Sequence, residues 1–277
     1  MKHHITILPS GHQFDVTEGE SVLAAARRAG YALPYSCLSG SCGSCRARVI
    51  EGECMQSSSA RALSADERER GDVLLCQAHP QSDLTIAVRE VPSVADLPRR
   101  MIAVKIVAKD LLAADVLRVR LKPPKGEPFC WLAGQYLDVL LPEGKRRAFS
   151  IANAPEDAGL IELHVRKVPG GGFTQQLFDA YPVGSLLRIE GPLGTFVARE
   201  DSERPMIFMA GGTGFAPVKA IVEHFIALGT RRPMRLYWGA RSAADLYLRA
   251  LAEQWGREVP NLAFHAVVSH PALADGL

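Results

Sequence analysis

Residues 37–45 read Cys-Leu-Ser-Gly-Ser-Cys-Gly-Ser-Cys, and a further cysteine, Cys76, follows after thirty intervening residues. The three cysteines of the loop are Cys37, Cys42 and Cys45, so the spacing is Cys-x4-Cys-x2-Cys with a distant fourth residue. This is the plant-type pattern of [2Fe–2S] ligation, in which four thiolates converge on one iron pair. The four cysteines are therefore predicted to hold a [2Fe–2S] cluster.

The small residues of the loop support this prediction. Gly40 and Gly43 permit a short segment to wrap tightly, and its backbone N–H groups are then able to donate to the sulfurs. A zinc site or a set of free thiols is the alternative, and Cys-x2-Cys alone would favour zinc, but the x4 spacing argues against it. Cys54 and Cys130 fall outside the pattern and are interpreted as small buried or idle thiols.

The sequence around the loop predicts a small α+β domain over residues 1–91. A hairpin is expected from residues 5 to 16, and a helix from Ser21 to Ala29 that Gly30 closes. Ser64 and Glu67 stand in capping-box register, and residues 73–88 alternate as strands do. Residues 92–101 contain two prolines and no periodic apolar face, which is typical of a linker.

Two further domains are predicted beyond the linker. Between residues 102 and 200, short β-branched or Leu-rich runs alternate with Pro and Gly clusters, which favours an antiparallel barrel. Residues 204–277 have a different pattern: an apolar run at 206–210, a glycine-rich turn, a helical segment at 216–228 and another apolar run at 234–238. Strand, turn, helix and strand in this order indicate a parallel α/β unit.

Motifs in these two domains offer the groups that a flavin and a nucleotide need. Arg147, Phe149 and Ser150 supply a cation, an aromatic ring and a hydroxyl, and the turn at 171–174 supplies backbone N–H groups for a pyrophosphate. The run at 211–217, Gly-Gly-Thr-Gly-Phe-Ala-Pro, ends with a proline suited to the first turn of a helix, whose N-terminus stabilises phosphate. Each signal is weak alone, because Gly-rich turns between strands are common.

The order of these motifs carries a resemblance. The cysteine loop, Arg-x-Phe-Ser, Gly-Gly-x-Thr, the run at 211–217 and Tyr-Trp-Gly-Ala-Arg at 237–241 together resemble the ferredoxin-NADP⁺-reductase superfamily, in its branch with an N-terminal ferredoxin domain. Within it, the sequence looks most like the CDP-6-deoxy-glucoseen reductase group and the reductase components of aromatic-ring oxygenases. The resemblance implies a β-grasp ferredoxin domain, a six-stranded FAD barrel and a Rossmann-like NAD(P)-binding domain.

The resemblance also implies which positions bind cofactors. For the flavin they are Arg147, Phe149, Ser150, His164, Arg166, Gly171, Gly172 and Thr174. For the pyridine nucleotide they are Gly212, Thr213, Gly214, Pro217 and Arg241. Phe149 stands where the family usually has Tyr, so stacking is kept and a phenol hydrogen bond is lost. The family's C-terminal Cys-Gly-Pro motif and terminal aromatic do not occur before Leu277, so we expect a truncated nucleotide domain with a marginal sheet.

Composition excludes several other classes of protein. The 277 residues are 47% hydrophobic and 22% charged, which fits a globular multidomain chain and not a disordered one. A formal charge of +2 argues against nucleic acid as the main partner. No window reaches the roughly 18 apolar residues of a membrane span. We expect a cytoplasmic monomer whose partner is a protein electron acceptor, either an oxygenase component or a sugar dehydratase.

The predicted function is NAD(P)H-dependent electron transfer through FAD and the [2Fe–2S] cluster, with no side chain acting as nucleophile or base. One alternative is an electron-carrier module without competent hydride transfer, and another is a free flavin or ferric reductase. A cluster is superfluous for reducing free flavin, which weighs against the latter. For the coenzyme, Arg241 and the acidic Asp245 point in opposite directions, so we expect NADH with appreciable use of NADPH.

Overall fold

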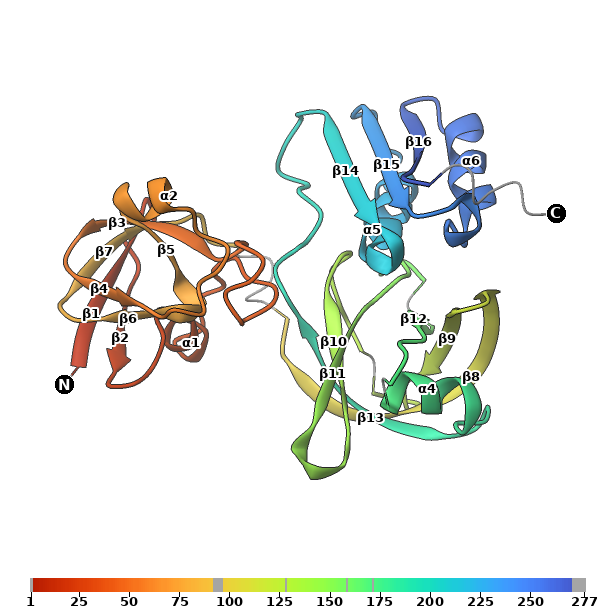
Figure 1. Cartoon of the computed structure of the whole chain (residues 1–277), viewed down its shortest axis with the longest axis horizontal. Helices are drawn as coiled ribbons and strands as arrows, with labels where there is room; N and C mark the ends of the chain where they lie inside the picture. The colour runs from red at the N-terminus through yellow and green to blue at the C-terminus, as the bar shows by residue number, and fades with distance from the viewer. Residues whose placement is uncertain (1, 92–96, 128, 158, 171, 271–277) are drawn as a thin grey trace. The chain divides into compact units, whose positions relative to one another are not determined.

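The structure is a computed structural model that describes residues 2–91, 97–127, 129–157, 159–170 and 172–270 (Figure 1). Contacts divide the chain into two compact units. Unit 1 contains Met1–Pro98 with Gly194–Phe196, and unit 2 contains Arg99–Leu193 with Val197–Leu277. Gly171, one of the predicted flavin positions, lies outside the described residues, as do residues 92–96 of the predicted linker. Among the described residues, no helix is long and apolar enough to cross a membrane.

Unit 1 is a mixed five-stranded sheet with the order β2-β1-β7-β3-β5. Its elements are β1 (Lys2–Leu8), β2 (Gln13–Thr17), α1 (Val22–Arg28), β3 (Arg46–Glu51), β4 (Cys54–Gln56), α2 (Ala65–Glu69), β5 (Asp72–Leu74), η1 (Leu75–Gln77), β6 (Ala78–Pro80) and β7 (Leu84–Ala87). β1 pairs antiparallel with β2, as the predicted hairpin requires, and parallel with β7. The small α+β fold expected for this part of the chain is confirmed.

Local sequence signals explain the two helices of unit 1. The side chain of Ser21 accepts a hydrogen bond from the Ala24 N–H at 3.2 Å and caps α1. Gly30 adopts a φ of 87° after the helix, and the Tyr31 N–H then reaches the Ala26 carbonyl at 2.9 Å. α2 begins with the predicted capping box of Ser64 and Glu67. The apolar face of α1 is buried in the core of unit 1.

The first part of unit 2 is a six-stranded antiparallel sheet with the order β11-β10-β13-β8-β9-β12. Its elements are β8 (Arg100–Ala113), β9 (Val116–Lys122), β10 (Tyr136–Leu140), η2 (Pro142–Gly144), β11 (Arg146–Ser150), β12 (Ile161–Arg166), α4 (Gly172–Asp179) and β13 (Leu186–Leu193). The six-stranded antiparallel arrangement is as predicted, but its closure into a barrel is partial. Among the described residues, the two end strands share a single bridge, between Ile151 and Leu163.

The second part of unit 2 is a parallel three-stranded sheet with the order β14-β15-β16 (Figure 1). Its elements are β14 (Met206–Gly211), η3 (Gly212–Gly214), α5 (Phe215–Ala227), β15 (Met234–Ala240), η4 (Ala243–Asp245), α6 (Arg249–Glu258) and β16 (Leu262–Val268). Leu236 and Trp238 are buried in one core with α5 and α6. On the opposite face, Ile207, Met209 and Val267 are 67%, 81% and 50% exposed, so no described element covers that face.

Candidate functional site

The cysteine loop has the tight backbone that its glycines predict. Gly40 and Gly43 both have a φ of 75°, in the left-handed region that favours glycine. A Cβ on Gly40 would lie 2.5 Å from the Ser59 carbonyl oxygen, so no side chain fits there. Leu38 also has a positive φ, of 60°, and its carbonyl accepts a hydrogen bond from the Gln77 amide at 3.1 Å. The loop is thus anchored beside the segment that carries Cys76.

Backbone N–H groups of the loop point at its sulfurs. The Ser39 and Ser41 N–H groups both lie 3.4 Å from the Cys37 sulfur. Burial raises the pKa of the Cys37 thiol, but the hydrogen bonds from the serines outweigh it and lower that pKa to about 6. The Ser44 N–H makes a 3.5 Å contact with the Cys42 sulfur. These donors stabilise thiolates, the form of cysteine that binds iron.

The four predicted ligands influence one another. Cys37 interacts with Cys42, and Cys45 interacts with both Cys76 and Cys42. Cys45 and Cys76 are buried, and burial is the main cause that raises the pKa of Cys45 to about 12. Among the described residues, no group of three potential ligands surrounds one point, so the preference for a [2Fe–2S] cluster rests on the spacing of the four cysteines.

The predicted flavin residues of β11 lie on an accessible strand. Arg147 is exposed, and its guanidinium donates to the neighbouring Arg146 carbonyl at 2.9 Å. Phe149 is half-buried, with its ring 6.1 Å from that of Phe173 in α4, and Ser150 is half-buried beside it. An accessible cation, aromatic ring and hydroxyl on one strand are the groups that a flavin nucleotide requires.

The segment after β12 is the second predicted flavin contact. Gly172 begins α4, and the Thr174 hydroxyl accepts a hydrogen bond from the Val168 N–H at 3.4 Å. The Gly172 N–H donates to the Gly170 carbonyl at 3.1 Å. The role of Gly172 and Thr174 toward the flavin stays a prediction.

His164 is placed differently from the other predicted residues. Its ring is buried, with Nδ1 3.1 Å from the Tyr247 hydroxyl and Nε2 3.0 Å from the Glu162 carboxylate. Burial lowers the pKa of His164, so the ring is neutral near pH 7. Both ring nitrogens thus have partners within the protein. The cofactor contact of His164 expected from the sequence stays a prediction.

The glycine-rich turn after β14 is held by aromatic side chains. Gly212 has a φ of 51°, and its carbonyl accepts a hydrogen bond from the Trp238 indole at 3.0 Å. Phe215, the first residue of α5, stacks on Trp238 with 3.7 Å between ring centroids. Thr213 and Gly214 complete the turn, and Pro217 lies in the first turn of α5 as predicted. The turn therefore presents the N-terminus of a thirteen-residue helix at the carboxyl end of the sheet.

A cavity of about 440 Å³ opens beside this turn. Its walls come from the carboxyl ends of the three parallel strands and from β12: Arg166, Gly211, Gly212, Gly239, Ala240, Arg241, Asp245, Val267 and Ser269. Ligands of open α/β sheets bind at this end of the strands. The cavity brings together Arg166, Gly212 and Arg241, three of the positions predicted from the sequence.

The side chain of Arg166 gives this cavity its anion-binding character. Its Nη1 pairs with Asp115 at 3.2 Å, but its Nε and Nη2 are buried and make no hydrogen bond among the described residues. A Cβ on Gly212 would lie 3.8 Å from Nη2, so the guanidinium faces the glycine turn. Buried donors without partners are costly, and an incoming phosphate would satisfy them. The sequence predicted Arg166 at the flavin pyrophosphate, and this role stays a prediction; in the structure Arg166 lines the cavity beside the Gly212 turn.

Arg241 and Asp245 lie on the same cavity wall. Arg241 is exposed. Asp245 accepts hydrogen bonds from the N–H and the hydroxyl of Ser242, each at 2.9 Å, and these bonds lower the pKa of its carboxyl. An ionised carboxylate and a guanidinium are thus both available where a ribose would be bound.

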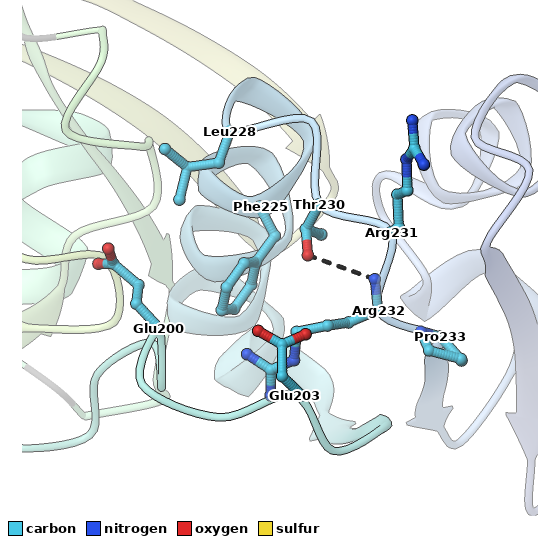
Figure 2. Close-up of a pocket in the computed structure, with 8 residues that line it drawn as sticks. All are labelled: Glu200, Glu203, Phe225, Leu228, Thr230, Arg231, Arg232 and Pro233. Atoms are coloured by element: carbon cyan, nitrogen blue, oxygen red, sulfur yellow. Dashed lines mark hydrogen bonds between the residues drawn. The ribbon is translucent and has the colours of Figure 1, made fainter.

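A second cavity, of about 470 Å³, contains none of the predicted positions (Figure 2). It lies at the amino end of β15, beside Pro233, which is the opposite end of the strand from the glycine turn. Arg232 crosses it, with its guanidinium 5.3 Å from the centre of the Phe225 ring and its Nε donating to the Arg204 carbonyl at 3.1 Å. Arg232 is bound within the protein and Arg231 is exposed, and this cavity lies away from the carboxyl ends of the strands, so the cavity at Arg166 is the candidate for the nucleotide.

Comparisons with known proteins agree with this geometry. The chain matches the 2Fe-2S iron-sulfur cluster binding domain over residues 5–81, the oxidoreductase FAD-binding domain over 103–197 and the oxidoreductase NAD-binding domain over 208–275. It is 39% identical over 269 residues to the protein RfbI of Salmonella typhimurium, which covers 97% of this chain and 79% of RfbI. The chain belongs to the iron–sulfur flavoprotein branch of the ferredoxin reductases. It is accordingly an NAD(P)H-dependent oxidoreductase with a [2Fe–2S] cluster and FAD.

Other ferredoxin reductases of this branch have similar coverage. The CDP-6-deoxy-L-threo-D-glycero-4-hexulose-3-dehydrase reductase of Yersinia pestis is 37% identical, over 97% of this chain and 80% of that protein. The terephthalate 1,2-dioxygenase reductase component 1 of a Comamonas species is 36% identical over the same shares. The solved cytochrome P450 reductase GcoB of Amycolatopsis has a TM-score of 0.70 and 34% identity, covering 97% of this chain and 81% of that one.

Proposed function

We propose that the ferredoxin reductase described here takes electrons from NAD(P)H bound in the cavity at Arg166 and delivers them singly, through its cluster, to a separate protein acceptor. The observation that carries the proposal is the pair of buried, unpartnered nitrogens of Arg166 beside the Gly212 turn. Relatives named as dehydrase and dioxygenase reductases support an acceptor in a sugar dehydratase or oxygenase system. Bound FAD would supply the change from two-electron to one-electron chemistry.

The chain's own residues would bind and orient the cofactors. Arg166 and the N-terminus of α5 would hold the dinucleotide phosphates, since Arg166 has two buried nitrogens without a partner among the described residues and the helix N-terminus favours negative charge. Phe149 would support the flavin ring, and Arg147 would neutralise phosphate charge. The N–H groups of Ser39 and Ser41 would stabilise the thiolate of Cys37. No side chain needs to act as a nucleophile or base.

The proposal includes the domain division: a ferredoxin-type domain at 1–91, a linker at 92–101, an FAD-binding domain at 102–200 and an NAD(P)-binding domain at 204–277. The matched family ranges, 5–81, 103–197 and 208–275, support it. It also includes a cytoplasmic location, because four thiolate ligands stay available most readily in a reducing compartment. The monomeric state expected from the sequence stays a prediction.

Anaerobic reduction tests the proposed function. The purified protein loaded with both cofactors should show flavin and iron–sulfur absorbance, and both should bleach on addition of either NADH or dithionite. Bleaching by dithionite but by neither NADH nor NADPH would identify an electron carrier instead. A spectrum without iron–sulfur bands after reconstitution with iron and sulfide would reject the proposal.

Coenzyme choice gives a second test. Because Arg241 is exposed, its interaction with a 2′-phosphate is screened by water, and an exposed ion pair contributes little. We expect Arg241→Ala to lower kcat/KM for NADPH roughly twofold to fivefold and to leave the value for NADH almost unchanged. Steady-state kinetics with both coenzymes measure this difference. Equal losses with NADH and NADPH would show that Arg241 does not read the 2′-phosphate.

A further inference from the structure

A lysine is buried in the middle of α5, on the apolar side of that helix. Lys219 is only 6% exposed, and its neighbours Val218 and Ala220 are core residues. Its ammonium group donates to the Ala152 carbonyl at 3.1 Å and pairs with the carboxylates of Glu223 at 2.9 Å and Glu162 at 3.2 Å. Lysine is almost never buried without such partners, and here they come from α5 itself, from β12 and from the segment after β11.

The Glu162 carboxylate continues the connection to the glycine turn. It accepts from the His164 ring at 3.0 Å, and that ring contacts the Tyr247 hydroxyl at 3.1 Å. The Tyr247 ring packs edge-on against Trp238, with 5.1 Å between centroids, and the Trp238 indole donates to the Gly212 carbonyl. A continuous series of polar and aromatic contacts therefore runs from Lys219 to the turn.

The charges of this network are compensated inside the protein. Burial raises the pKa of Glu162, but His164 and Lys219 outweigh it and hold that pKa at about 2. The carboxylate is thus ionised opposite the lysine. Buried ion pairs contribute little net stability compared with apolar residues of the same size, whereas loss of one partner is costly. The pair between Lys219 and Glu162 therefore matters less for the stability of the fold than for the relative position of α5 and β12, the two elements that it joins.

The location joins the three segments that bear the predicted cofactor positions. Ala152 follows Ser150 by two residues, and Glu162 and His164 precede Arg166 on β12. Lys219 follows Pro217 by two residues in α5. We infer that Lys219 is a positioning residue for hydride transfer: through Glu162 and the Ala152 carbonyl it fixes the nucleotide turn relative to the strands that bind the flavin. This inference rests on the proposed function.

Hydride transfer is sensitive to such positioning. Reacting atoms must approach to about 3–3.5 Å, and an error of about 1 Å caused by a distant residue can cost roughly a hundredfold in rate. Lys219 is not one of the predicted flavin or nucleotide positions. Its loss should therefore change the rate of flavin reduction more than the affinity for NADH. If Lys219 had a merely structural role, its replacement would lower thermal stability and would affect the rate of flavin reduction and the affinity for NADH to similar extents.

The test compares Lys219→Met with Lys145→Met in the full-length protein loaded with both cofactors. Lys145 forms an exposed pair with Glu143 in the turn between β10 and β11, so it is the matched control. For Lys219→Met, stopped-flow measurement should show a limiting rate of flavin reduction by NADH that is roughly tenfold to a hundredfold lower. The apparent Kd for NADH should stay within about threefold of wild type. A limiting rate equal to that of Lys145→Met would overturn the inference.

Hydrogen–deuterium exchange supplies a readout that does not depend on turnover. In Lys219→Met, the amides of residues 151–166 and 212–223 should exchange faster, and in Lys145→Met they should not. In Lys219→Met, Glu162 keeps its contacts with His164 and Arg120 but loses the buried ammonium group that compensates its charge. The double variant Lys219→Met/Glu162→Gln, which removes that carboxylate charge, should recover part of the protection. Unchanged exchange in both segments would contradict the positioning role.

Two further outcomes remain decisive. If the wild-type protein is not reduced by NADH, the proposed function fails, and exchange alone then decides whether Lys219 joins the segments.

If Lys219→Met does not retain FAD, Glu223→Gln takes its place, because this isosteric change weakens the more exposed end of the network. Glu223→Gln should then lower the limiting rate in the same direction by a smaller factor, and an unchanged rate with unchanged exchange would overturn the inference.

Discussion

A Cys42→Ser variant is expected to lose the iron–sulfur absorbance entirely and to keep its FAD. Cys42 is one of the four predicted ligands, so its loss leaves the cluster with three thiolates, and a serine hydroxyl is a poor replacement for a soft thiolate ligand. The flavin positions lie in unit 2, whereas all four cluster ligands lie in unit 1. Each unit has its own hydrophobic core, so the loss of one cofactor should not expel the other.

Visible spectra with iron and flavin analysis measure this outcome. Cys54→Ser is the matched control, since Cys54 lies in β4 outside the ligand pattern and burial raises the pKa of its thiol to about 11. That variant should keep both cofactors. Simultaneous loss of flavin and iron from Cys42→Ser would mean that the two units do not fold independently, and retention of the iron–sulfur bands would reject Cys42 as a ligand.

The cluster site could be predicted from the sequence because most of its information is local. Three of its four thiols lie within nine residues, and the spacing dictates how the chain must wrap. The glycine at position 40 then has a φ of 75° and no room for a side chain, as a tight loop requires. The capping box of α2 was predictable for the same reason, because its two residues are three positions apart.

The interior of unit 2 could not be predicted in the same way. Lys219 and Ala152 are 67 residues apart, and no local pattern shows that a lysine amid apolar residues will meet a carbonyl on another segment. The signal was present, since Lys219 interrupts the apolar run of a buried helix, but its partners depend on tertiary packing. α6 was not predicted because its mean hydropathy is low: five of its ten residues are charged or carry an amide, and only Ala252 and Trp255 are buried.

Arg166 is the residue for which the sequence and the structure favour different cofactors. Its position before the glycine-rich turn at 170–174 favoured the flavin pyrophosphate. β12 ends at Arg166, however, and its side chain reaches the Gly212 turn, which lies 46 positions further along the chain. An arginine at the end of a strand can face either cofactor, depending on which sheet packs beside it. The residues next to it in the sequence do not reveal that packing.

An Arg166→Leu variant is therefore expected to bind NAD⁺ roughly tenfold to a hundredfold more weakly and to retain FAD, because a charged hydrogen bond to phosphate contributes about 1.5–3 kcal/mol. Titration calorimetry with NAD⁺ and flavin content after gel filtration measure the two effects. Thermal stability without nucleotide should change little, since the removal of two buried nitrogens that lack partners among the described residues offsets the loss of the partly exposed ion pair with Asp115. Arg188→Leu, at an exposed position on β13, is the control and should alter neither value. If Arg166→Leu instead lost FAD and kept its affinity for NAD⁺, the arginine would serve the flavin pyrophosphate, as its sequence position first indicated. The cavity beside Gly212 would then have to bind the dinucleotide through backbone N–H groups and Arg241 alone.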